Sequence, residues 1–157
     1  MLLTQRQIES FEQNGYLVLE NFVSQEDCDK LRGRASKIVE DFDSSESVNI
    51  FTTNEQTRYS DHFFLESGNK IRCFFEEEAF DENGFLKQPK KFSINKIGHA
   101  MHDLDPVFDS FSRTEALEAV AKDVGFEDPR ILQSMYIFKQ PKICLLYTSD
   151  AADDLTR

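Results

Sequence analysis

The side chains best suited to bind a metal lie together in one short segment, at His99, His102, Asp103 and Asp105. Two histidines three positions apart can share one helical face, and with one carboxylate they would resemble a 2-His-1-carboxylate iron site. A structural explanation competes with this one. Asp105 precedes Pro106 and is suited to start a helix, Asp103 is expected to be solvated or to cap, and a half-buried histidine is more often hydrogen-bonded than metal-bound. Zinc is disfavoured further because a fourth ligand is missing.

Two other residues could contribute to a binding site. Lys96 stands between apolar neighbours, so its ammonium could point into a cleft and hold a carboxylate or a phosphate. Taken alone it would be a surface lysine, just as Met135 would be a core filler and Glu76 part of a solvated acidic turn. Phosphate-binding glycine loops, HExxH and GxSxG motifs are all missing from the sequence.

Helices are predicted by capping residues and apolar periodicity. Thr4 and Gln7 form a capping-box pattern, and Gly15 is suited to end that first helix. A second helix is predicted from Ser24, with acidic residues in its first turn and one apolar stripe that runs to Phe42. Further helices are predicted to start at Asp105-Pro106 and, ending at Gly125, at Thr114.

Strands are predicted where β-formers cluster between turn residues. Residues 16–19 are expected to form a short buried strand, and 63–65 and 70–75 a hairpin around 67–69. Residues 131–138 are apolar at alternate and adjacent positions, which predicts a strand buried on both faces. A polar loop is expected over residues 43–60. The fold class is therefore α+β.

Composition limits the possible functions. The chain has 157 residues, enough for one domain, and a formal net charge of −11. Such a field repels nucleic acid and anionic membranes, and neither is an expected partner. Three cysteines without a CxxC pair favour buried free thiols for Cys28 and Cys73. The start lacks a secretory signal and no apolar run could span a bilayer, so a cytoplasmic location is expected.

Three segments resemble the phytanoyl-CoA dioxygenase family. The first contains Gly15-Tyr-Leu-Val-Leu19, the second Asn95-Lys-Ile-Gly-His99, and the third Gln133-Ser-Met-Tyr-Ile-Phe138. The resemblance extends over about residues 4 to 142. It implies a double-stranded β-helix (jelly roll) with helices around it, of which this chain would be the amino-terminal, truncated part.

The resemblance also implies chemistry. Family members use Fe(II), 2-oxoglutarate and O2 to hydroxylate a small-molecule substrate, for which an acyl-CoA is a candidate. By motif match, Lys96 and Met135 would line the 2-oxoglutarate site. The family holds its iron by a His-x-Asp pair and a later His, but this sequence has no His beyond His102. We therefore expect neither a metal ligand nor a catalytic residue in this chain.

Domain organisation follows from the same comparison. Residues 1–142 are expected to form a partial phytanoyl-CoA dioxygenase-like domain. Residues 143–157 depart from the family pattern, resemble translated adaptor sequence and are expected to be a non-native tail.

Three functional hypotheses remain open at this point. The first is a fragment of an Fe(II)- and 2-oxoglutarate-dependent dioxygenase, inactive by itself. The alternative is a non-catalytic short isoform or degenerate paralogue that acts as a binding module. The third is an unrelated metal protein that uses His99, His102 and Asp103. Sequencing the transcript past the codon for Lys142 would separate the first two.

Overall fold

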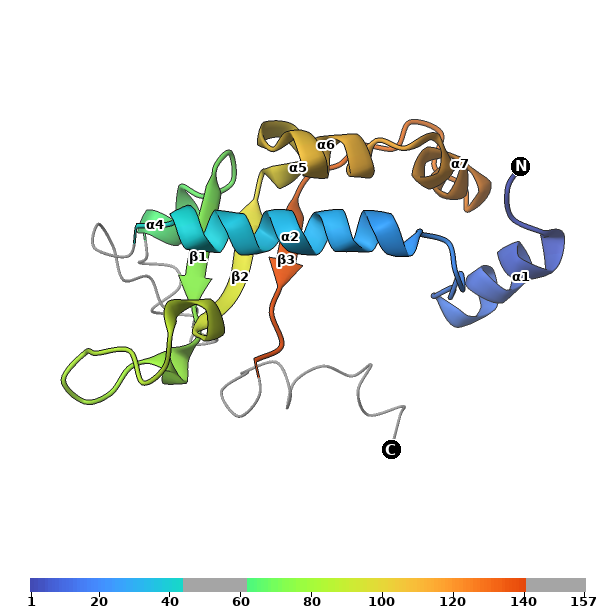
Figure 1. Cartoon of the computed structure of the whole chain (residues 1–157). Coiled ribbons are helices and arrows are strands. Elements are labelled where there is room, and N and C mark those ends of the chain that lie inside the picture. The colour runs from blue at the N-terminus through green and yellow to red at the C-terminus, as the bar shows by residue number, and fades with distance from the viewer. Residues whose placement is uncertain (44–61, 141–157) are drawn as a thin grey trace.

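A computed structural model describes residues 1–43 and 62–140. This part of the chain contains both helices and antiparallel strands, which confirms the mixed α and β class (Figure 1). The helices are α1 (Gln5–Asn14), α2 (Gln25–Asp41), α4 (His62–Leu65), α5 (Met101–Leu104), α6 (Pro106–Ser112) and α7 (Glu115–Asp123). The strands are β1 (Ile71–Phe75), β2 (Ile94–His99) and β3 (Ser134–Ile137).

Both of the first two helices begin, and the first of them ends, as their capping residues predict. The Thr4 hydroxyl accepts a hydrogen bond from the Gln7 backbone N–H, and the Gln7 side chain accepts from the Thr4 N–H at 2.9 Å. Gly15 ends α1 with φ 78°, a left-handed conformation that costs glycine little. Ser24 caps α2 by accepting from the Asp27 N–H at 3.1 Å.

The helix starts predicted at residues 105 and 114 are also confirmed. Asp105 caps α6 by accepting from the Val107 and Phe108 N–H groups at 3.1 and 3.3 Å, and Pro106 occupies the first turn without losing a hydrogen bond. The second of these helices, α7, spans Glu115–Asp123, but the Thr114 side chain makes no capping hydrogen bond.

The three strands form one antiparallel sheet in the order β1-β2-β3. In its register Lys96 lies between Phe74 of β1 and Ile137 of β3, while Ile97 lies between Cys73 and Tyr136. All six residues of β2 are buried. The side chains on both faces of this central strand are therefore packed against other parts of the protein.

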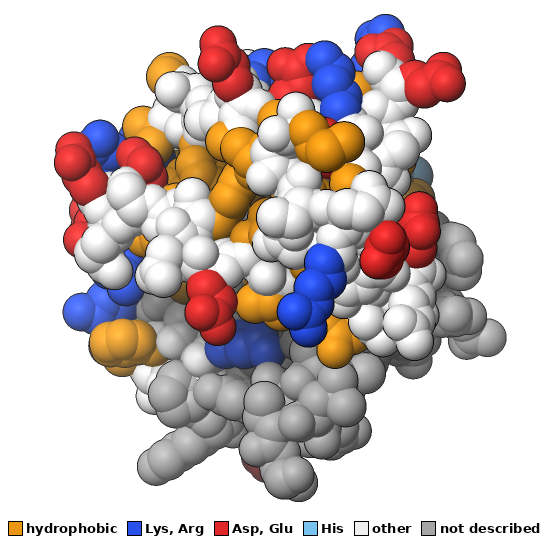
Figure 2. Space-filling view, turned by 90° about the vertical axis from the view of Figure 1, so that its right-hand side faces the viewer, with side chains coloured by type: hydrophobic (Ala, Val, Ile, Leu, Met, Phe, Trp, Pro, Cys, Tyr) orange, Lys and Arg blue, Asp and Glu red, His pale blue; other side chains and the backbone are white. Residues whose placement is uncertain are grey.

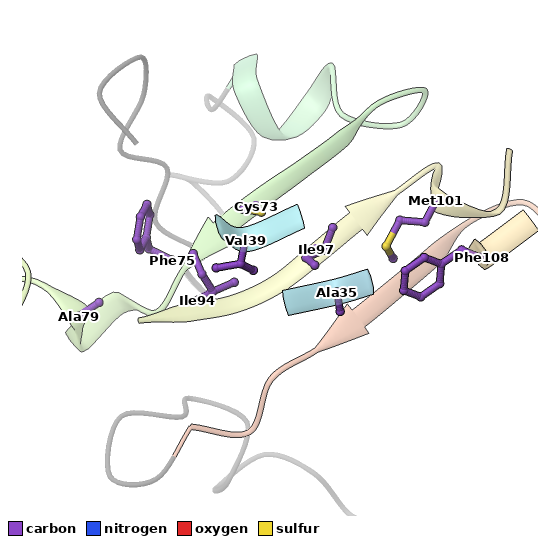
Figure 3. Packing of buried hydrophobic residues seen from close by; sticks show 9 residues of the cluster. All are labelled: Ala35, Val39, Cys73, Phe75, Ala79, Ile94, Ile97, Met101 and Phe108. Carbon is purple, nitrogen blue, oxygen red and sulfur yellow. The ribbon is translucent and has the colours of Figure 1, made fainter. Parts of the chain in front are cut away.

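Helix α2 crosses one face of the sheet and forms the core with it (Figure 1). Figure 3 shows how side chains from α2, β1, β2 and the segment that follows β2 meet there. The buried cluster consists of Ala35, Val39, Cys73, Phe75, Ala79, Ile94, Ile97, Met101 and Phe108. Burial of these apolar groups is the main force that holds the helix on the sheet.

Two strand predictions were wrong in the amino-terminal half. Residues 16–19 form no strand, and the side chains of Tyr16 and Val18 are 61% and 70% exposed. No described strand lies beside them to complete a ladder, and isolated strands are not stable. Residues 63–65 belong to helix α4 and not to a hairpin, since Phe63 and Phe64 pack their rings onto Phe74 of β1.

Two burial predictions were also wrong. The strand expected over 131–138 is shorter, and its exposure alternates: Tyr136 packs towards the core, whereas Met135 and Ile137 are 48% and 43% exposed. Within the described residues, β3 is an edge of the sheet, so one of its faces is not covered. Glu76 is fully buried, because its N–H continues the β1 pairing by donating to the Ser93 carbonyl at 2.9 Å.

Some predictions concern segments that lie outside the described residues. These are most of the polar loop at 43–60, Cys144 and the tail at 143–157. Cys28 and Cys73 both have free thiols, as predicted, although Cys28 is only half-buried. Among the helices of the described ranges, none combines the length and the apolar character required to cross a membrane.

Candidate functional site

Lys96 lies in the centre of the sheet and is buried, with 6% of its surface exposed. The residues on either side of it in β2 face the opposite way, because side chains alternate along a strand. Ile97 packs into the core beneath α2, which places Lys96 on the other face. On that face the Lys96 ammonium lies 5.4 Å from the centre of the Phe64 ring and 5.6 Å from that of Phe74.

Met135 joins Lys96 on the same face of the sheet. It pairs with Gly98, two positions along β2 from Lys96, so the two side chains are diagonal neighbours on adjacent strands. Gly98 has no side chain to separate them, and a Cβ atom at this position would lie 3.6 Å from Met135 Cγ. The structure therefore brings together both residues that the sequence singled out, one buried and one half exposed.

Four further residues belong to this site, and sequence reasoning assigned none of them to it. His99 Nδ1 lies 2.7 Å from Ser67 Oγ, and the His99 ring lies 5.5 Å from the ring centres of both Phe64 and Phe74. Phe74 lies in a segment that was predicted to be a strand, and the register of that strand places it opposite Lys96. No comparable signal existed for Phe64, whose segment was expected to be a strand.

The site contains one histidine whose protonation is unfavourable. Burial lowers the pKa of His99 below its usual value, and the neighbouring Lys96 ammonium lowers it further, while a hydrogen bond with the backbone of Ser67 acts in the opposite direction. The imidazole is accordingly neutral near pH 7 and leaves the positive charge of this cluster on Lys96.

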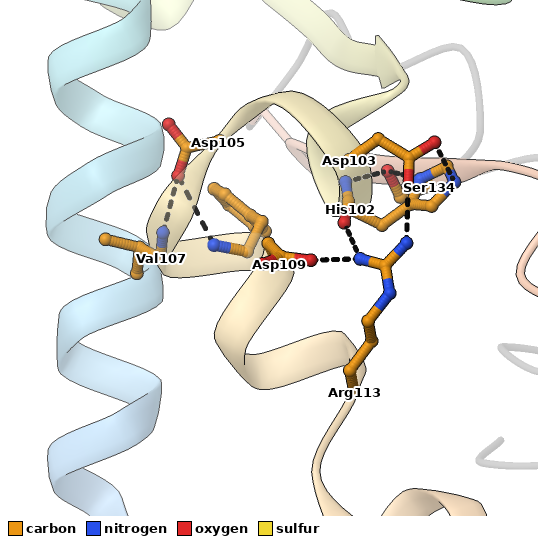
Figure 4. Close-up of polar contacts among 8 residues, drawn as sticks. His102, Asp103, Asp105, Val107, Asp109, Arg113 and Ser134 are labelled. Carbon is orange, nitrogen blue, oxygen red and sulfur yellow. Dashed lines mark hydrogen bonds and ion pairs between the residues drawn. The ribbon is translucent and has the colours of Figure 1, made fainter.

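A second polar cluster holds the start of β3 next to the site (Figure 4). Ser134 Oγ accepts from the His102 backbone N–H at 3.1 Å and lies 2.9 Å from His102 Nδ1. The Arg113 guanidinium binds the His102 carbonyl and pairs with Asp103 and Asp109. These bonds tie helix α5 to the residue that precedes Met135 and so help to fix the position of that side chain.

These contacts do not support the metal hypothesis. His99 is hydrogen-bonded to Ser67, and His102 is hydrogen-bonded to Ser134. Asp105 binds Arg34 and the backbone of α6. Within residues 1–43 and 62–140, no three His, Cys, Asp or Glu side chains come together in a way that could hold a metal ion. Both histidines are therefore hydrogen-bonded structural groups in the described part of the chain.

A separate hollow lies at the α1–α7 end of the molecule. Its volume is about 480 Å³, and its lining includes Phe22, Val23, Leu31, Val107, Phe111 and Leu117. Figure 2 shows the hydrophobic side chains that gather on this face, with charged groups around them. Neither Lys96 nor Met135 contributes to it, so the hollow is distinct from the site on the sheet.

The fold and the site define a mixed α and β protein with one sheet face under a helix and a buried lysine on the other. Residues 11–145 match the family model of phytanoyl-CoA dioxygenase (PhyH). This match extends over most of the sequence and includes both Lys96 and Met135. The chain belongs to the phytanoyl-CoA dioxygenase family.

Individual relatives agree with the family match. The chain is 46% identical over 141 residues to phytanoyl-CoA dioxygenase of Arabidopsis thaliana, which corresponds to 90% of this chain and 50% of that protein. It is 42% identical to phytanoyl-CoA dioxygenase domain-containing protein 1 of Danio rerio, with the same two shares, 90% and 50%. The homologue of the latter in Caenorhabditis elegans is also 42% identical, over 86% of this chain and 48% of that protein. The chain spans about half the length of the curated relatives it matches.

Proposed function

We propose that this chain provides two walls of the 2-oxoglutarate site of an Fe(II)- and 2-oxoglutarate-dependent dioxygenase. The observation that carries the proposal is the buried Lys96 ammonium beside Met135, on one face of the sheet of a phytanoyl-CoA dioxygenase family member. Such dioxygenases belong to the oxidoreductases. Lys96 would bind a carboxylate of 2-oxoglutarate, and Met135 would contact its carbon chain.

The chemistry of the two side chains fits this co-substrate. A carboxylate is attracted more strongly to an ammonium that lies among apolar groups than to one in open water, because the local dielectric is lower. Phe64 and Phe74 supply such surroundings on one side of Lys96. Met135 is flexible and polarizable, which suits contact with a short aliphatic chain.

The described residues do not fit iron in the same way. Fe(II) with 2-oxoglutarate supplies the oxidising power for hydroxylation in such enzymes, and three protein ligands hold the metal. The described residues contain no fitting set of three ligands. We therefore assign Lys96 and Met135 to the co-substrate and none of the described residues to the metal.

The substrate is proposed only as a small molecule. The name of the Arabidopsis relative identifies phytanoyl-CoA as what that protein acts on, so an acyl-CoA is the first candidate to test. A cytoplasmic location is part of the same proposal. So is the absence of nucleic-acid or membrane partners, which the net charge of −11 supports.

Binding of 2-oxoglutarate to the full chain tests the proposal directly. Titration followed by NMR should show saturable shifts at residues near Lys96, and Lys96→Met should weaken the affinity by about tenfold or more, since a charge-assisted contact is lost. Lys91→Met is the matched control, because Lys91 lies over the Phe92 ring on the exposed surface. Equal affinities for the wild type and Lys96→Met would exclude Lys96 from a co-substrate site.

A further inference from the structure

Three rings form a cluster under the Lys96 side chain. The centres of the Phe64 and Phe74 rings lie 5.8 Å apart, and the His99 ring lies 5.5 Å from each of them. The Lys96 ammonium lies over both phenyl rings, at 5.4 and 5.6 Å. Any movement of the His99 ring therefore displaces the surface on which the ammonium lies.

The hydrogen bonds of Ser67 determine which nitrogen of His99 carries the proton. Ser67 is fully buried, and its hydroxyl donates to the Phe64 carbonyl at 2.5 Å. A serine hydroxyl has one hydrogen, so the contact at 2.7 Å to His99 Nδ1 requires Nδ1–H to be the donor. In a neutral ring, Nε2 then bears the lone pair.

We propose that His99 is a positioning residue for Lys96: Ser67 fixes the ring as the neutral Nδ1–H tautomer, and the ring holds Phe64 and Phe74 beneath the ammonium. In so far as Lys96 binds 2-oxoglutarate, this inference rests on the proposed function. It adds a residue pair, Ser67 and His99, whose described contacts reach the lysine through the two phenyl rings.

The neutral ring also explains why a histidine can occupy this place beside a lysine. A protonated imidazole would put a second positive charge next to the Lys96 ammonium, which Coulomb repulsion disfavours. Burial and the lysine charge both lower the pKa of His99, in agreement with the hydrogen-bond geometry. His99 can therefore brace the aromatic rings without competing for the negative group that Lys96 would bind.

The tautomer is the first quantity to measure. Nitrogen-15 NMR of the labelled full chain at pH 7.5 should show a protonated, pyrrole-type Nδ1 and an unprotonated, pyridine-type Nε2 for His99. Free imidazole side chains favour the opposite tautomer, so this result is specific to the bond with Ser67. Ser67→Ala removes the acceptor and should shift His99 towards the Nε2–H form.

The position of Lys96 is the second quantity. Protons on Lys96 Cε lie above two aromatic rings and should show an upfield ring-current displacement. Both Ser67→Ala, which keeps the ring, and His99→Asn, which keeps a donor but no ring, should move this signal towards its random-coil value. The Lys91 signal, displaced by Phe92, should not change in either variant.

The affinity for 2-oxoglutarate should fall by about fivefold in each variant, the size of one modest ammonium–ring contact. The double variant should lose no more than either single one, because Ser67 and His99 act as one unit. A backbone spectrum like that of the wild type shows that each variant has kept its fold.

Two NMR outcomes would overturn the inference, and one binding outcome would do so as well. One is an Nε2–H tautomer for His99 in the wild type, and the other is an unchanged Lys96 signal in both folded variants. The proposed function fails separately, if the wild type binds no 2-oxoglutarate while the tautomer and the Lys96 signal behave as expected. If binding depends on Lys96 but not on Ser67 or His99, the proposed function stands and the positioning role is wrong.

Discussion

Arg34 on α2 and Asp105 at the start of α6 form an ion pair, with Arg34 Nε 2.6 Å from Asp105 Oδ2. Asp105 is 1% exposed, and its second oxygen accepts the two backbone hydrogen bonds that cap α6. One carboxylate thus starts a helix and attaches it to its neighbour (Figure 4 shows the cap). The residue considered above as a possible metal ligand is therefore fully engaged in the fold.

Replacement of Asp105 should destabilise the protein. Asp105→Ala removes the cap and the partner of Arg34 and should lower the free energy of unfolding by about 2–3 kcal/mol. Asp105→Asn keeps an oxygen for the cap and should lower the free energy of unfolding by only about 1 kcal/mol. Chemical denaturation measures both values. Asp128→Ala is the control, since the Asp128–Arg130 pair is exposed and should contribute less than about 0.5 kcal/mol. Equal losses at positions 105 and 128 would contradict this interpretation.

Isoleucines on neighbouring strands offer a matched test of the packing. Ile97 of β2 is fully buried beneath α2, whereas Ile137 of β3 is 43% exposed. Ile97→Ala should lower the free energy of unfolding by about 3 kcal/mol, because a cavity remains in the core. Ile137→Ala should cost about 1 kcal/mol or less. The predicted arrangement of the two sheet faces would be wrong if the order of these losses were reversed.

Stability should depend on pH through His99. Its pKa is lowered in the folded state, so the unfolded chain binds a proton first as the pH falls below the ordinary histidine value of 6.5. The free energy of unfolding therefore decreases from there down to the lowered folded-state pKa. Among the described residues, the groups that contact or act on the ring are Phe64 of α4, Ser67 just after it, Phe74 of β1 and Lys96 of β2, and of these Lys96 carries the charge.

The measurement compares unfolding at pH 7.5 and 5.5. The wild type should lose more stability over this interval than His99→Asn, whose side chain does not titrate. His62→Asn replaces an exposed histidine and should behave as the wild type does. Parallel losses in the wild type and in His99→Asn would show that other groups cause the pH dependence.

Cys73 should resist thiol reagents in the folded protein. Burial raises the pKa of its thiol to about 12, so almost no reactive thiolate exists at neutral pH. In the double variant Cys28→Ser, Cys144→Ser, only Cys73 can react with a disulfide reagent. Its modification should be slow in buffer and fast in denaturant, and fast reaction in buffer would contradict the buried position in β1.

The helices were predictable because their signals are local. Thr4, Ser24 and Asp105 each satisfy backbone groups within three residues, so the sequence alone contains the whole interaction. Strands depend on partners that are distant in the sequence. The segment at 16–19 has strand-forming residues but no partner among the described strands, and Phe63-Phe64 packs on the sheet from a helix.

The candidate site was predictable only in part for the same reason. The motif identified Lys96 and Met135, and the register of β2 and β3 then placed them on one face. Ser67, Phe64 and His99 reach the lysine through tertiary packing, which no local pattern reports. Glu76 was assigned to the surface because an acidic run usually is solvated, but the sheet continues through it.

The alternation along β2 has a consequence for how this protein can vary. Lys96 and Ile97 are adjacent in sequence, but the Lys96 side chain lies in the candidate site and the Ile97 side chain lies in the core. A substitution at position 96 can therefore alter the proposed binding site while Ile97 continues to stabilise the core. Such a strand allows binding specificity to evolve in steps that leave the scaffold intact.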